Sequence, residues 1–141
     1  MMLLWAAVAA ASPVADQLRA RDGVECVALG EASAALRDEL LALAAPATLP
    51  ASVPMRAAQC LAERFGDDAA VITELSRWAD DPARPGQVLL LLARAETLPE
   101  PVAVAVVGAA LRSPHTRVSA RAGQLVAVSA RPALRALAPA P

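Results

Sequence analysis

Proline and glycine interrupt the chain at regular places, and this spacing limits the fold more than any other feature. The uninterrupted segments are about 10 to 18 residues long, which is typical of helices and long for strands. The composition agrees, because 37 residues are alanine and only 2% are aromatic. Alanine favours helices, whereas a β-sandwich needs β-branched and aromatic residues. The breaks lie at 46–54, 82–86, 99–101, 114 and 132.

The segment after Pro54 shows the helical pattern most clearly. Apolar and small side chains recur there every three or four residues, as on the buried face of an amphipathic helix. We expect Gly66 to end this helix and Asp67 or Asp68 to cap the next one. The second helix is expected to end at the Asp-Asp-Pro sequence of 80–82. The predicted buried face of the first helix consists of Met55, Ala58, Leu61, Ala62 and Phe65.

Similar pairs of segments recur with a period of about 30 to 36 residues, which predicts an array of helical hairpins. The valines at 102, 104, 106 and 107 fit a strand as well as a helix. Pro101 suits the first turn of a helix, so we expect a helix there. Both helices within 87–111 are apolar nearly all round, and neighbouring helices must therefore cover several of their sides. The further segments are 24–29, 31–43, 87–95, 101–111, 117–129 and 132–137.

Residues 54–82 resemble a HEAT repeat of the short bacterial type. The resemblance implies an all-α fold, a HEAT-like α-solenoid of about three to four helical hairpins. It also implies an interaction scaffold and not a particular chemistry. The other units match less well, since 97–99 is Thr-Leu-Pro where the family has a Gly-Asp turn. The matching positions are Arg56, Ala57, Ala58, Leu61, Gly66, Asp67, Leu75, Asp81 and Pro82.

The first residues are typical of an export signal. Residues 1–11 carry no charged side chain and are shorter than a membrane span, which needs roughly 20 apolar residues. We therefore expect a signal peptide at 1–11, or extending to Ala15, followed by a single helical-repeat domain at 12–141. The alternative is a buried first helix. No later apolar stretch reaches spanning length, so we expect no membrane span after cleavage. The absence of lysine and the richness in alanine, arginine and proline suggest a bacterial source. Together with the predicted export signal, this source predicts a periplasmic or secreted protein.

The two cysteines, Cys26 and Cys60, fit an oxidising compartment. Each precedes a glycine that is expected to end a helix, so the two are predicted at similar heights on neighbouring helices. Cys60 lies off the apolar face of its helix, which core packing does not explain. A disulfide is the first interpretation. Two free buried thiols and a redox pair are the alternatives.

The sequence offers little for catalysis. Its one histidine, His115, has no partners at metal-ligand spacing and is expected in a solvated turn. The acidic pairs at 67–68 and 80–81 could suggest acid–base chemistry, but both lie at helix ends, where capping accounts for them. There is no glycine-rich phosphate loop and no nucleophile elbow. We expect no enzyme activity, no cofactor and no metal.

Charge is distributed unevenly along the chain. Residues 1–100 contain 8 arginines and 14 acids, whereas residues 101–141 contain 5 arginines and no acid. The arginines near the end are expected to be exposed, either as a solvated cap or as a docking patch for an acidic protein partner or anionic lipid headgroups. Nucleic acid is not expected, because aromatic side chains that could stack on bases are lacking. These candidate partner-binding residues are Arg117, Arg121, Arg131 and Arg135.

Trp78 is a further candidate for partner binding, because tryptophan is common at binding hot spots. It also continues the apolar stripe of Val71 and Leu75, which favours a place in the core. Taken together, the sequence predicts an exported, non-catalytic adaptor for protein–protein interaction in the bacterial envelope. An accessory, chaperone-like or inhibitor-like subunit of an envelope complex is the alternative, and an enzyme comes third.

Overall fold

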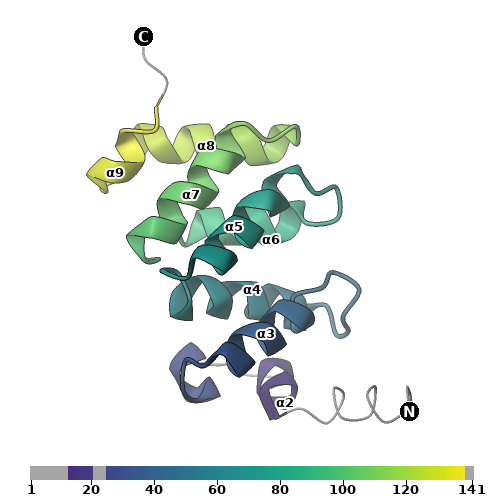
Figure 1. Ribbon diagram of the computed structural model, residues 1–141. Helices are drawn as coiled ribbons and strands as arrows, with labels where there is room; N and C mark the ends of the chain where they lie inside the picture. Colours follow the sequence, from purple (N-terminus) through teal and green to yellow (C-terminus); the bar gives the residue numbers. More distant parts are fainter. Residues whose placement is uncertain (1–12, 21–24, 139–141) are drawn as a thin grey trace. The chain divides into compact units, whose positions relative to one another are not determined.

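A computed structural model describes residues 13–20 and 25–138, in which the backbone forms helices, turns and loops and no strand (Figure 1). The predicted all-α class is confirmed. The chain divides into two compact units, unit 1 (Met1–Arg64) and unit 2 (Phe65–Pro141). The predicted signal peptide at 1–11 lies outside the described residues. None of the described helices is long and apolar enough to cross a membrane.

Unit 1 is built around its last helix. That helix, α4, contacts each of the other elements of the unit. Its alanines leave room for close approach, and Ala57, Ala58 and Leu61 are all fully buried. Neighbours therefore cover more than one side of α4. The elements of unit 1 are α2 (Pro13–Arg19), the 3-10 helix η1 (Cys26–Leu29), α3 (Ala34–Leu43) and α4 (Ser52–Arg64).

Unit 2 is built around α7, which contacts α5, α6, α8 and α9. The residues of α7 are apolar on nearly all sides, and this pattern predicted that several neighbours cover it. The valines between 102 and 107 lie in this helix and not in a strand. The elements of unit 2 are α5 (Ala69–Arg77), the 3-10 helix η2 (Trp78–Asp80), α6 (Pro85–Ala93), α7 (Glu100–Leu111), α8 (Thr116–Val128) and α9 (Pro132–Arg135).

Capping residues and a glycine mark where the helices begin and end. Asp68 accepts hydrogen bonds from the backbone N–H groups of Ala70 and Val71 and so caps α5, as one of the two predicted caps. The segment 24–29 differs from its prediction, because it forms only the four-residue η1. Gly30 ends η1 with a φ of 104°, a conformation that glycine adopts readily. The six residues of the predicted segment would make fewer than two turns of an α-helix.

Candidate functional site

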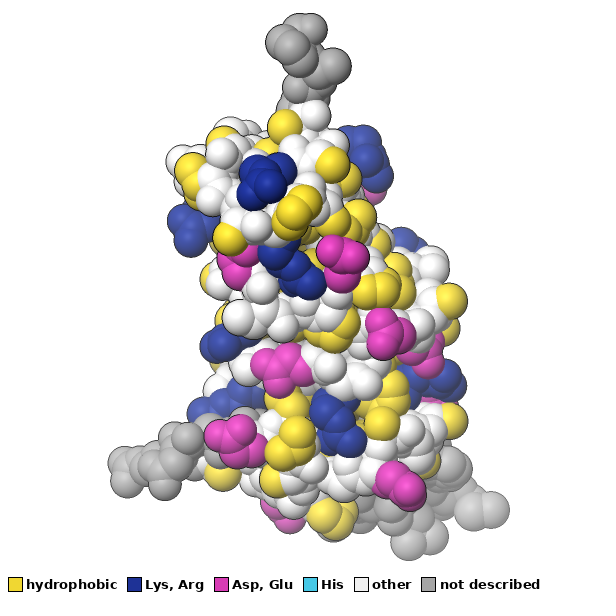
Figure 2. All heavy atoms as spheres, turned by 90° about the vertical axis from the view of Figure 1, so that its left-hand side faces the viewer, with side chains coloured by type: hydrophobic (Ala, Val, Ile, Leu, Met, Phe, Trp, Pro, Cys, Tyr) yellow, Lys and Arg dark blue, Asp and Glu magenta, His cyan; other side chains and the backbone are white. Residues whose placement is uncertain are grey.

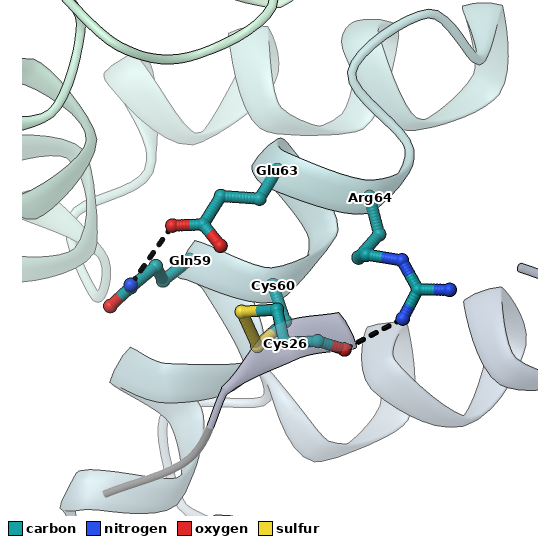
Figure 3. Close-up of a disulfide and its surroundings, with 5 residues drawn as sticks. All are labelled: Cys26, Gln59, Cys60, Glu63 and Arg64. Carbon is teal, nitrogen blue, oxygen red and sulfur yellow. Dashed lines mark hydrogen bonds between the residues drawn. A yellow bond between two sulfur atoms is a disulfide. The ribbon is translucent and has the colours of Figure 1, made fainter. Parts of the chain in front are cut away.

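The disulfide between Cys26 and Cys60 joins η1 to α4 within unit 1 (Figure 3). Their Cα atoms lie 5.2 Å apart, as a disulfide requires. Both residues are buried. The predicted crosslink is therefore present, and neither cysteine is free. Cys26 lies on a helix that contacts α4, as predicted, but this helix is the short 3-10 helix η1, which Cys26 begins.

Two arginines flank the disulfide on the same stripe of α4. Arg64, one turn after Cys60, donates hydrogen bonds from its Nη atoms to the carbonyls of Cys26 and Gly30, both at 2.6 Å. Figure 3 shows its side chain reaching from α4 to the Cys26 carbonyl. Gly30 follows the last residue of η1, and carbonyls at the C-terminal end of a helix lack partners within it, so a cation is favourable there. Arg64 thus holds η1 at the same place as the disulfide.

Arg56, one turn before Cys60, makes the matching contact with α2. Its Nη1 donates to the carbonyls of Leu18 and Ala20 at 2.7 and 2.6 Å. Residues 56, 60 and 64 therefore attach α2 and η1 to α4. Two of them do so by hydrogen bonds from a charged group and the third by a covalent bond. The sequence did not predict this role of the arginines, and Arg56 was noted there only as a position that matches the HEAT repeat. Their spacing of four residues on each side of Cys60 is the signal that could have revealed it.

Arg131 makes the same kind of contact in unit 2. Its Nη1 donates to the carbonyls of Ala95 and Leu98 at 2.7 and 2.6 Å, just after the end of α6. The expectation that Arg131 is exposed is wrong. It is half-buried, because the carbonyls after α6 take its hydrogen bonds. Arg135 is exposed but donates to the carbonyls of Ser129 and of residue 130, at the end of α8.

Arg117 and Arg121 behave as predicted for exposed side chains. Both are exposed on α8, and neither forms an ion pair or hydrogen bond with the described residues. They line a hollow of about 410 Å³ between α8 and α6, together with Leu89, Ala120 and Gln124. Their charges therefore face a concave, solvent-filled surface.

A second hollow, of about 250 Å³, continues the first along α8. Arg121 and Gln124 line both hollows, so the two form one groove, called here the α6–α8 groove. The far end of this groove is apolar apart from Glu96. The side chain of Val128 there is 81% exposed. The second hollow is lined by Leu92, Ala93, Glu96, Arg121, Gln124, Leu125 and Val128.

Trp78 lies in the core and is only 2% exposed. Its Nε1 donates to Glu74 at 3.2 Å, and the guanidinium of Arg84 lies 4.1 Å from the centroid of its ring. Asp81 lies 3.5 Å from Arg84 and fixes that side chain. The predicted place of Trp78 in the core is confirmed, and its ring has little surface exposed to solvent. The cation–π contact and the hydrogen bond account for its place.

The remaining residues considered for catalysis or metal binding make hydrogen bonds that hold the fold. His115 is half-buried at the N-cap of α8, and its Nε2 lies 3.2 Å from the carbonyl of Asp81. The carboxylate of Asp81 accepts a hydrogen bond from the N–H of Ala83, as in a turn. Within residues 13–20 and 25–138, no three His, Cys, Asp or Glu side chains gather in a way that could hold a metal ion.

Acidic and basic side chains are interspersed on the face drawn in Figure 2, and neither sign forms one continuous patch there. The α6–α8 groove is distinguished by the position of Arg117 and Arg121, which lie one turn apart on α8 and line the same hollow. Comparison of the chain with protein-family models, with curated proteins and with solved structures finds no match.

Proposed function

We propose that this chain is an exported, non-catalytic adaptor of the HEAT-like α-solenoid type, which binds another protein in the bacterial envelope. The observation that carries the proposal is the α6–α8 groove with its two arginines. An adaptor needs a surface that its own fold does not use, and the side chains of Arg117 and Arg121 are free of ion pairs and hydrogen bonds with the described residues. Charges at such a surface steer and select a partner.

Long-range hydrogen bonds support the repeat architecture. Five side chains bind backbone carbonyls that lie 33 to 38 residues earlier in the chain. This separation agrees with the repeat period of the sequence, and within each of the two units these bonds tie a later segment to an earlier one, as stacked repeats require. The five side chains are Arg56, Arg64, Ser113, His115 and Arg131.

The disulfide supports export. Disulfides form and persist in oxidising compartments, and the cytosol keeps most thiols reduced. Cys26 and Cys60 lie in a short unit, where a crosslink adds stability that a small core lacks. An envelope or extracellular location would keep this bond intact.

Affinity capture with charge reversal tests the adaptor function. The mature protein, crosslinked in envelope extract of its native host, should retain a specific partner that mass spectrometry identifies. The double variant Arg117→Glu with Arg121→Glu should lose that partner without a change in melting temperature. The matched control is Arg94→Glu with Arg112→Glu, whose residues are exposed but line neither hollow, and it should keep the partner. A partner that is retained by both double variants would contradict a binding role of the groove.

A further inference from the structure

The two ends of the α6–α8 groove differ in chemistry. Arg117 and Arg121 make one end basic, whereas Leu92, Leu125 and Val128 make the other apolar. The residues of α8 that line the groove, from 117 to 128, recur at spacings of three and four. They form one face of the helix over about three turns, or roughly 16 Å. A ligand that fits this groove must carry the complementary chemistry in the same order.

The basic end is poorly balanced within the protein. The first turn of α8 has no acidic residue and no side-chain cap, although Arg117 lies there. A cation near a helix N-terminus is unfavourable, because the helix dipole is positive at that end. The only acid that lines the groove, Glu96, belongs to the apolar end and forms no ion pair with Arg121 among the described residues. A ligand at the basic end of the groove would therefore be favoured by negative charge.

The shape favours a helix as the occupant. Side chains that project from two packed helices, α6 and α8, leave a furrow into which the ridge of a third helix fits. Recognition of an amphipathic helix in such a groove uses anchors at the same spacings of three and four residues. Carboxylates one turn apart on that helix would meet Arg117 and Arg121. Acids in its first turns would also stabilise the helix itself.

We propose that the α6–α8 groove binds an amphipathic helix of the partner protein, with two carboxylates one turn apart at its start and apolar side chains after them. The carboxylates pair with Arg117 and Arg121, and the apolar side chains cover Leu125 and Val128. This inference rests on the proposed adaptor function and specifies its partner. A membrane is a poorer fit, because lipid-binding clusters contain about four to eight basic residues, whereas Arg131 and Arg135 already bind backbone carbonyls.

A synthetic peptide tests the proposal directly. The probe is a capped, alanine-rich peptide of roughly 20 residues, long enough to be helical in water. It carries two glutamates one turn apart and leucines over the next two turns of the same face. The mature protein should bind it in a fluorescence anisotropy titration. The variant Arg117→Gln with Arg121→Gln should bind it about tenfold more weakly, as expected for two solvated ion pairs.

Two controls separate charge from apolar contact. The same peptide with glutamine in place of glutamate should bind the mature protein about as weakly as the original peptide binds the double variant. The protein variant Leu125→Gln with Val128→Gln should also lose affinity, because it removes the apolar end. Added salt should weaken binding to the mature protein, since exposed charges are screened. The control variant Arg94→Gln with Arg112→Gln should bind the original peptide as the mature protein does.

Three results would overturn the inference: no binding of the peptide to the mature protein, equal binding to the variant lacking Arg117 and Arg121, or binding to phosphatidylglycerol vesicles in preference to the peptide. The adaptor function is judged separately, by the capture experiment with envelope extract. If the partner is captured through Arg117 and Arg121 but the peptide does not bind, the adaptor function stands and the helical ligand is wrong.

Discussion

Arg64 and Arg131 each place their hydrogen-bond donors on two backbone carbonyls, whereas Arg117 and Arg121 face a solvent-filled groove. The first pair holds segments together that are far apart in sequence, and the second pair is free to bind a partner. Composition and charge patterns treat the four as equivalent. The distinction depends on which carbonyl lies within reach, and that is a property of the folded backbone. For this reason the sequence correctly predicted the exposure of Arg117 and Arg121 but not the engagement of Arg131.

We predict that Arg64→Met lowers the free energy of unfolding by about 1 to 3 kcal/mol, because hydrogen bonds from a charged donor are lost while the apolar stem is kept. Urea denaturation followed by circular dichroism measures the effect. Arg117→Met is the matched control and should stay within about 0.5 kcal/mol of the unmodified protein. Equal losses for the two variants would mean that the carbonyl contacts of Arg64 add nothing to stability.

At the scale of the elements, periodicity predicted most of the helices. The spacing of apolar residues follows the turn of the helix itself, so α4, α5 and α8 could be found from it. Helix α7 is apolar on nearly all sides, and Pro101 near its start indicated a helix there. The 3-10 helix η1 could not, because four residues are too few to show a period. The crosslink of Cys26 to Cys60 was predicted from spacing, although the element that carries Cys26 was not. The α6–α8 groove is lined by side chains from two helices. The sequence of either helix alone does not predict which other helix it packs against, so the groove could not be predicted.

We predict that Asp68→Ala lowers the free energy of unfolding by about 1 kcal/mol, because α5 loses the acceptor for two of its first N–H groups. Asp67→Ala removes the same charge from the neighbouring residue, whose exposed carboxylate does not cap the helix. It should leave stability nearly unchanged. Thermal unfolding of both variants at the same ionic strength gives the comparison. A similar loss for Asp67→Ala would assign the effect to charge and not to capping.

At the scale of the whole molecule, the two units are stabilised by different means. Unit 2 buries Trp78 among its apolar residues. The described part of unit 1 has no buried aromatic residue, and its core consists of alanine, valine, leucine, proline and the two half-cystines. Short units seldom stabilise themselves by apolar burial alone and use crosslinks instead. The disulfide, with Arg56 and Arg64 beside it, supplies this crosslink at the centre of unit 1.

The crosslink should therefore be a large part of the stability of unit 1. Cys26 and Cys60 are 34 residues apart, and in the chain-entropy model a loop of that length is worth about 3 to 4 kcal/mol. We predict that Cys26→Ala with Cys60→Ala loses about this amount in urea denaturation. Hydrogen exchange should increase most in 25–30 and in α4, where η1 is held. Dithiothreitol should destabilise the unmodified protein to a similar degree and leave the double variant unchanged. If the double variant is as stable as the unmodified protein, Arg56 and Arg64 alone hold the N-terminal segment, and the bond then has no role as a structural crosslink.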